Sequence, residues 1–151
     1  MNYFETNEKN DIQQFYEFNY ELNLFDSIEK TKDKSQIDAI AKHKDRTFAV
    51  ELKHRLIPVS KYKTIMIEDY KYLELMLEYQ FYGREPLYIN FFHDAVAIFN
   101  LNKLKHKPKV RIMNIKSEGY DKNQVQERRY MLDLTDAVIF NYKWNNTTNY
   151  S

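Results

Sequence analysis

The sequence predicts an α+β (mixed α/β) domain, in which a helix, a three-strand antiparallel meander, a second helix and two strands precede a β-rich C-terminal extension. Apolar residues recur at helical spacing in two segments and alternate with polar residues in the segments between them. The 151 residues are 43% hydrophobic and 30% charged, enough for one core. We therefore expect a single domain over 1–151, with a core of about 5–101, an extension of about 102–143 and a frayed tail at 144–151.

The first predicted helix covers residues 7–22, NEKNDIQQFYEFNYEL. Its acidic residues begin early, where the helix dipole favours negative charge. Its apolar residues follow helical spacing at Ile12, Phe15, Tyr16, Tyr20 and Leu22.

Three strand-like runs follow, at 24–31, 35–43 and 46–55. In the third run, Phe48, Val50 and Leu52 alternate and so share one face. The connections KDK and KD are short enough for hairpins, which favours an antiparallel meander.

A second helix is predicted over 64–81, TIMIEDYKYLELMLEYQF. Met66, Tyr70, Leu73 and Leu77 are spaced by four, three and four residues, and Gly83 is a suitable end.

The remaining strands are predicted from apolar runs. PLYINFF (86–92) and AVAIFNL (95–101) indicate two core strands, and the basic connector NKLKHKPK follows them. We expect two further strands in VRIMNIKS (110–117) and RRYMLDL…AVIFNY (128–142).

The hairpin over 35–54 brings charged residues together. With a two-residue loop at Lys44-Asp45, His43 pairs with Arg46, which places Asp38 opposite Glu51 on one face of the sheet. Lys53 is two residues beyond Glu51 and so lies on the same face. A longer loop would break this opposition.

Two opposed carboxylates are normally destabilising, so this pair predicts a cation between them. Oxygen ligands without cysteine or a histidine cluster favour Mg²⁺ or Mn²⁺. A lysine beside them could orient a water or stabilise charge developing on a phosphate, which is the chemistry of metal-assisted phosphodiester hydrolysis. The alternative is an ordinary solvated hairpin, because an Asp…Glu-x-Lys pattern is weak on its own.

Charge is segregated along a chain whose net charge is only +1. Residues 30–63 contain ten basic and four acidic residues, whereas residues 1–29 contain one basic and seven acidic residues. A second basic block lies at 103–116. Basic blocks around an acidic pair suit a polyanion such as nucleic acid, although such segregation is also common in other proteins.

Several classes of protein are disfavoured by what the sequence lacks. It has no cysteine, and therefore no disulfide or thiolate site. It has no Walker loop, no dinucleotide fingerprint and no G-x-S-x-G motif. No apolar run is long enough to span a bilayer, and the first residues do not resemble a signal peptide, so we expect a cytoplasmic protein without a membrane partner.

The element order, with Gln36-Ile37-Asp38 and VELK (50–53) in the meander, resembles the PD-(D/E)XK nuclease superfamily. FAVELK matches the third core strand of that superfamily, and TIMIEDYKYLEL followed by PLYINFF is similar to small phage-type or Holliday-junction-resolvase-like members with a lysine in the second core helix. The resemblance covers about 5–101, with isoleucine where many members have proline before the aspartate.

The resemblance implies a restriction-endonuclease-like core, a Mg²⁺ or Mn²⁺ cofactor, DNA as the partner and, for structure-selective members, a homodimer. It implies that Asp38, Glu51 and the Leu52 carbonyl bind the metal, while Lys53 assists the attacking water. A non-catalytic nucleic-acid- or protein-binding module with the same fold is the alternative, and RNA is a second possible substrate.

Further residues are predicted to support this site. Members often have an additional acid on the first helix, for which Glu8 is preferred over Glu17, although Glu8 could be an ordinary surface residue that interacts with the dipole. Lys71 could reach a phosphate or form an exposed pair with Glu68 or Glu74. The remaining predicted phosphate contacts are Arg55, Lys61 and Lys63.

Overall fold

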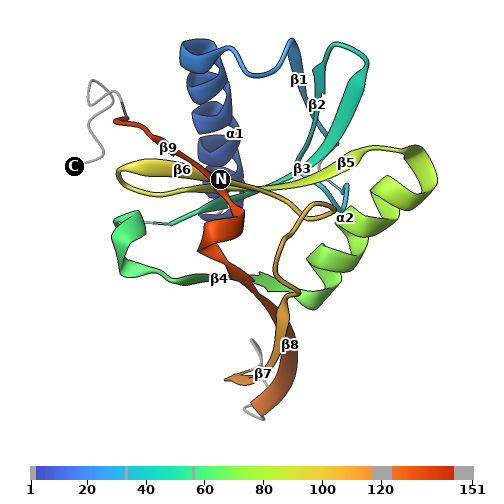
Figure 1. Cartoon of the computed structure of the whole chain (residues 1–151), viewed down its shortest axis with the longest axis vertical. Coiled ribbons are helices and arrows are strands. Elements are labelled where there is room, and N and C mark those ends of the chain that lie inside the picture. The colour runs from blue at the N-terminus through green and yellow to red at the C-terminus, as the bar shows by residue number, and fades with distance from the viewer. Residues whose placement is uncertain (1–2, 33, 56, 117–123, 145–151) are drawn as a thin grey trace.

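The computed structural model describes residues 3–32, 34–55, 57–116 and 124–144. It confirms the predicted α+β class, with two α-helices and two β-sheets (Figure 1). The elements are α1 (Tyr3–Leu22), β1 (Ser27–Lys30), β2 (Ala39–His43), β3 (Arg46–His54), β4 (Thr64–Glu68), α2 (Asp69–Tyr82), β5 (Glu85–Phe91), β6 (Ala95–Asn100), β7 (Lys109–Lys116), β8 (Gln124–Asp133) and β9 (Val138–Asn141), with short 3-10 turns at Val59–Lys61 and Leu134–Asp136.

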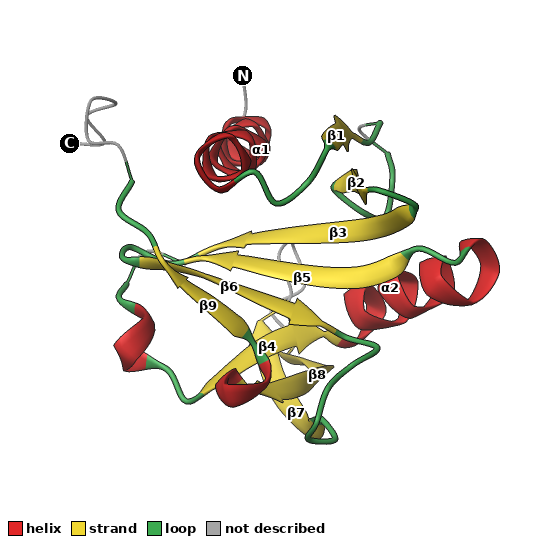
Figure 2. Ribbon diagram, turned by 45° about the horizontal axis from the view of Figure 1, so that its top comes forward, coloured by secondary structure: helices red, strands yellow, loops and turns green. Residues whose placement is uncertain are grey.

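A six-stranded sheet forms the centre of the fold, in the order β1-β2-β3-β5-β6-β9. The β3–β5 pair is parallel and every other neighbouring pair is antiparallel. Helix α1 covers one face, and α2 lies on the other side together with the three-stranded sheet β4-β8-β7 (Figure 2). The predicted meander is therefore confirmed as β1-β2-β3.

Each face of the central sheet contacts its own apolar cluster. On the α1 side, Phe15 and Phe18 of the helix pack with Val50 of β3 and Ile89 of β5. On the α2 side, Leu75 of the helix packs with residues of the central strands and with Ile65 and Ile67 of β4. Strand β3 thus lies between two cores, which fixes its position firmly.

The predicted helix over 64–81 is wrong in its first five residues, which form strand β4. Ile65 and Ile67 are buried and pair with Leu132 and Tyr130 of β8, a strand more than sixty residues away. This distant partner supplies the hydrogen bonds that favour a strand over another helical turn. Helix α2 then ends as predicted, because Gly83 adopts a left-handed conformation (φ 67°) and its N–H donates to the Tyr79 carbonyl.

The C-terminal third contains three strands rather than the two expected. Strand β9 pairs with β6, so the central sheet extends beyond the predicted core of 5–101. Trp144, expected in a frayed tail, instead donates a 2.8 Å hydrogen bond to the Phe92 carbonyl and packs edge-on against Phe91. The rest of that predicted tail, 145–151, lies outside the described residues.

Among the described helices, neither is both long enough and apolar enough to cross a membrane.

Candidate active site

The site is built at the open end of the β2–β3 hairpin. The two-residue turn at Lys44-Asp45 and the predicted register are confirmed, from His43 opposite Arg46 to Ala39 opposite Val50. Lys44 adopts φ 55°, which allows this tight turn. Regular pairing stops at Ala39, and the Asp38 N–H donates to the Val50 carbonyl at 3.0 Å, so the predicted direct pairing of Asp38 with Glu51 is wrong. Asp38 therefore lies where the two strands separate.

The Asp38 and Glu51 carboxyl groups contact each other at this separation. Asp38 Oδ2 accepts a 2.8 Å hydrogen bond from the Leu52 N–H, which fixes its side chain beside β3. Burial raises the pKa of both groups, and the nearby Asp38 charge further raises the pKa of Glu51, to about 8. Two carboxyl groups in contact in a buried place favour a shared proton or a cation.

Lys71 of α2 supplies a positive charge to this pair. Its Nζ lies 3.0 Å from Glu51 Oε1, and the lysine is half-buried rather than exposed. Burial lowers the pKa of Lys71, but the attraction of Glu51 and Glu68 is stronger, and the net pKa shift is upward. The expected exposed pair with Glu68 or Glu74 is therefore wrong: the ion pair is made across the fold, to the sheet.

Lys53 follows Glu51 on the same face of β3, opposite Asn90 of β5. It is half-buried, and its ammonium has no ion-pair or hydrogen-bond partner within the described residues. Asn90 is fully buried, and its amide nitrogen also has no partner there. The Lys53 ammonium is thus available to a water or an anion, whereas the Asn90 amide is enclosed by the fold.

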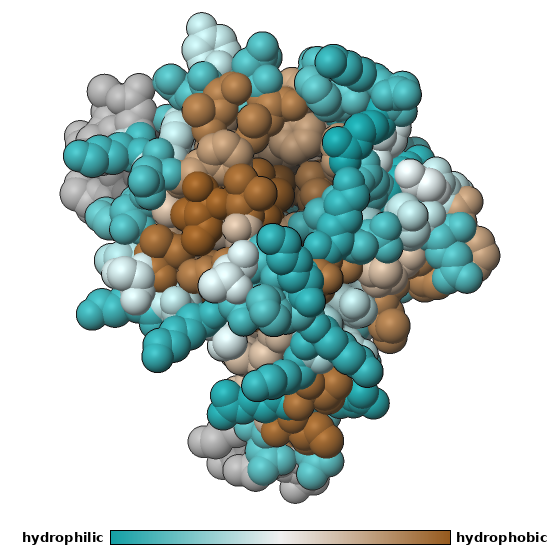
Figure 3. Space-filling model, viewed as in Figure 1, coloured by the Kyte–Doolittle hydropathy of each residue, from teal (hydrophilic) through white to brown (hydrophobic). Residues whose placement is uncertain are grey.

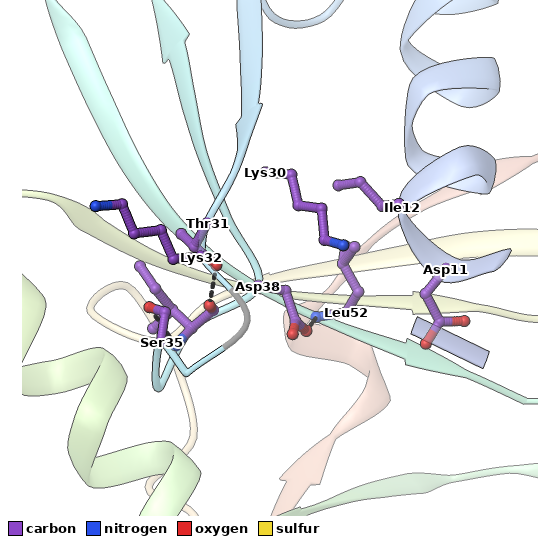
Figure 4. A pocket seen from close by; sticks show the side chains of 9 residues that line it. Asp11, Ile12, Lys30, Thr31, Lys32, Ser35, Asp38 and Leu52 are labelled. Atoms are coloured by element: carbon purple, nitrogen blue, oxygen red, sulfur yellow. Dashed lines mark hydrogen bonds between the residues drawn. The ribbon is translucent and has the colours of Figure 1, made fainter. Parts of the chain in front are cut away.

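A pocket beside Asp38 is lined by α1 and by the loop after β1 (Figure 4). Asp11 of α1 and Lys30 of β1 extend toward the same space as Asp38 and Leu52. These two residues, and Lys32 and Ser35 in the loop, were not predicted from the sequence. No sequence pattern indicates that a lone acid on a helix and a lysine in a strand belong to the same site, because only the folded chain brings them together.

Asp11 is held near the site by the end of β3. His54 Nδ1 lies 3.7 Å from Asp11 Oδ1 and 2.7 Å from Oε1 of the buried Gln14, so one imidazole connects β3 to α1. Burial lowers the pKa of His54.

The two acids predicted on the first helix, Glu8 and Glu17, differ in where the structure places them. Glu8 lies in α1, one turn before Asp11, but its side chain falls outside the described residues. Glu17 does not face the site: it lies six residues beyond Asp11, close enough to Tyr142 that its charge acts on that phenol.

Arg55, a predicted phosphate contact, has partners within the fold. Its guanidinium donates to Asn90 Oδ1 at 2.9 Å and to the Met66 carbonyl at 3.1 Å, and it lies over the Tyr62 ring. Arg55 therefore ties β3 and β5 to β4. Lys61 and Lys63, in the loop before β4, are exposed.

The oxygen atoms around Asp38 are possible ligands of a metal ion. Within the described residues, no three His, Asp or Glu side chains converge as metal ligands. The Leu52 N–H bonds to Asp38, and the N–H and C=O of one strand residue point to the same side, so the Leu52 carbonyl also faces the separation. Asp38, Glu51 and this carbonyl make an all-oxygen set that fits Mg²⁺ or Mn²⁺.

Known proteins match this chain in fold but not in sequence. No family model matches the sequence, and neither does any curated protein. Among solved structures, the chain is similar to Hjc, a Holliday junction resolvase from the archaeal hyperthermophile Archaeoglobus fulgidus, with a TM-score of 0.55. The two are 12% identical, and the match covers 85% of this chain and 90% of the resolvase. At this identity the likeness shows the fold alone, which is consistent with the restriction-endonuclease-like core predicted from the sequence.

Proposed function

We propose that this protein is a divalent-metal-dependent nuclease that hydrolyses phosphodiester bonds in DNA. The observation that carries the proposal is the contact between the Asp38 and Glu51 carboxyl groups at the point where β2 and β3 separate. The nuclease fold supports it, because the same fold occurs in a Holliday junction resolvase. The function of that neighbour is only an analogy here, since one fold can host many activities.

Asp38, Glu51 and the Leu52 carbonyl are the residues that would hold Mg²⁺ or Mn²⁺. Such an ion polarises a phosphoryl oxygen and lowers the pKa of a bound water. Asp11 of α1 is the described residue best placed to act as the additional acid, through a second layer of ligands or waters. Glu8, one turn away, keeps this role as a prediction.

Lys53 would orient the attacking water and stabilise negative charge that develops on the phosphate. Its ammonium has no other partner within the described part of the chain, and it is two residues from Glu51 on one face of β3.

Lys71 would change partners during this reaction. Its ammonium lies 3.0 Å from Glu51 Oε1. With Asp38 and Glu51 holding the metal, Lys71 would be available to bind a phosphate oxygen. Lys32, Lys61 and Lys63 are exposed basic residues that would contact the backbone of the DNA around the site.

The experiment is a cleavage assay with four-way-junction, linear duplex and single-stranded DNA, in Mg²⁺ or Mn²⁺. We expect Lys53→Ala to lose activity by roughly a hundredfold or more, because it removes an electrostatic and proton-transfer group. Lys42→Ala, an exposed lysine on the neighbouring strand β2, is the matched control and should cleave like the wild type. RNA substrates of the same shapes test the choice of DNA. Absence of cleavage with every metal and substrate, or equal cleavage by Lys53→Ala, would refute the proposal.

A non-catalytic binding module is the second candidate, favoured by the Lys71–Glu51 ion pair, which gives Glu51 a structural role. Calorimetric titration with Mn²⁺ separates the two. A nuclease should bind Mn²⁺ and lose that binding in Asp38→Asn, whereas a binding module held together by Lys71 should show no heat in either protein. Homodimerisation remains a prediction, which sedimentation of the purified protein tests.

A further inference from the structure

A β-hairpin made by β7 and β8 projects from the body of the protein (Figure 1). Strand β7 is the edge of the small sheet, because β8 pairs with β4 on its other side. We call this hairpin, with the connector 103–108 that leads into it, the arm. None of the residues named above for hydrolysis lies in the arm.

The arm concentrates positive charge. Residues 103–116 contain six lysines and arginines and no acidic residue, in the alternating pattern KLKHKPKVR followed by IMNIK. Lys103 is paired with Glu85 of β5, but Lys105, Lys107, Lys109 and Arg111 are all exposed. An anionic partner would thus find several cations that have no ion-pair partner among the described residues, in strand β7 and in the connector before it.

The register within the arm places like charges together. Arg111 of β7 lies opposite Arg129 of β8, and the next pair is Ile112 opposite Arg128. Glu127 partly neutralises Arg129 at 3.4 Å. Like charges directly opposite one another in a ladder are destabilising, so this arrangement favours an external anion that can bridge them.

Exposed apolar side chains lie on both faces of the arm: Val110 and Ile112 share one face with Arg128, and Val125 shares the other with Arg111. Val110, Ile112 and Val125 are 48%, 61% and 47% exposed. Figure 3 shows hydrophobic atoms on the arm bordered by hydrophilic ones. A two-stranded ribbon that combines basic and exposed β-branched side chains is suited to a groove of duplex DNA, where apolar groups meet sugars and base edges and cations meet phosphates.

The base of the arm contacts the helix that carries Lys71. The Tyr130 ring of β8 packs against Tyr72 of α2 at 4.4 Å between ring centres. Arg129 Nη1 lies 3.7 Å from the sulfur of Met66 in β4, the strand that leads into α2. A duplex held along the arm would therefore continue toward the N-terminal part of α2.

We propose that the arm is a second DNA-binding surface, which grips the phosphate backbone of a duplex outside the Asp38–Glu51 site. The choice of DNA rests on the proposed function. Lys109, Arg111 and Arg128 would contact phosphates, and Val110 and Ile112 would lie against the groove. The competing explanation is that the basic residues only protect an exposed edge strand from pairing with other chains.

The test measures binding without cleavage. A fluorescently labelled DNA duplex is titrated with the full-length protein in EDTA, at several salt concentrations, and anisotropy is recorded. The arm variant is Lys109→Ala/Arg111→Ala, and the control is Lys42→Ala/Lys143→Ala, two exposed lysines on other strands or their ends. Thermal unfolding of each variant checks that it is folded, and Lys109→Arg/Arg111→Lys preserves the charge.

We expect the arm variant to bind on the order of tenfold more weakly, and the slope of log K against log salt to fall in magnitude by about 1.8, since each lost phosphate contact contributes about 0.9. The control and the charge-preserving variant should bind like the wild type. Equal binding by the arm variant and the control, absence of wild-type binding, or tighter binding of an RNA duplex would overturn the inference. Aggregation of the arm variant with unchanged binding by its monomeric fraction would support edge protection instead.

These outcomes are independent of the cleavage assay. A DNA-binding arm on a protein that never cleaves would refute the nuclease proposal and leave the arm in place. Cleavage that depends on Lys53, with no change in DNA binding when the arm is altered, would support the nuclease proposal and refute the DNA-binding role of the arm.

Discussion

The two faces of β3 are opposite in character, although a single strand of nine residues supplies both. Phe48, Val50 and Leu52 point to the α1 side and pack in an apolar core. Glu51 and Lys53 point to the α2 side, where Glu51 is buried to 5% exposure beside another carboxyl group. Burying a carboxyl group is unfavourable unless it is compensated. Burial of the apolar face therefore stabilises the strand. This stabilisation offsets the cost of burying the Glu51 carboxyl group on the opposite face.

The largest expected effect comes from removing the charge of Glu51. Glu51→Gln keeps the shape of the side chain but removes a proposed metal ligand, and we expect cleavage to fall on the order of a thousandfold, about 4 kcal/mol of transition-state stabilisation. Initial rates of DNA cleavage measure this. Glu21→Gln, at an exposed position of α1, is the control and should retain full activity.

A moderate loss that excess Mn²⁺ restores would still agree with a ligand role. Wild-type rates at every metal concentration would contradict it, because a ligand cannot be removed without weakening the metal site.

The second effect is a dependence of stability on pH. The pKa of Glu51 rises from its ordinary 4.5 to about 8 in the folded chain, through burial and then the charge of Asp38. The folded state thus binds the proton more tightly than the unfolded state does. The stabilisation from this proton is complete below pH 4.5 and is lost as the pH rises to about 8.

Glu51→Gln provides the comparison that isolates this contribution, because other titrating groups such as His54 are common to both proteins. We expect the free energy of unfolding of the metal-free wild type, minus that of Glu51→Gln, to decrease between pH 4.5 and 8 and to level off above. Urea denaturation across this range measures it. A difference that is constant with pH, or that rises, would show that Lys71 keeps Glu51 ionised throughout.

The same contrast explains what could be predicted from the sequence. The hairpin register was predictable because a two-residue turn and a strand period of two leave only one pairing. Strand β4 was not, because TIMIE precedes a helix and its partner, β8, is distant in the chain. Asp11 and Lys30 reach the site from other elements, so only the tertiary fold places them beside Asp38.

The third effect is on the apolar face, at the residue before Glu51. Val50→Ala removes two methyl groups from a fully buried position, and we expect a loss of about 2 kcal/mol in the free energy of unfolding. Cleavage at a temperature where the variant is folded should be unchanged. Val138→Ala on β9 is the matched control, since Val138 is 61% exposed and its truncation should cost almost nothing. Equal losses in urea denaturation would show that burial on the α1 side does not determine the stability of β3.

The smallest effect is expected at the far end of β3, where Arg46 forms a two-pronged ion pair with Glu85 of β5. Its Nε and Nη2 donate to the two carboxylate oxygens at 2.6 and 2.7 Å, and this bonding lowers the pKa of Glu85 to about 2. Arg46 is 48% exposed, so solvent and salt screen the pair. We expect Arg46→Ala to lose less than about 1 kcal/mol in urea denaturation, with a smaller loss in high salt and unchanged cleavage. A loss as large as that of Val50→Ala would mean that the surface pair, and not the apolar face, fixes the parallel register of β3 and β5.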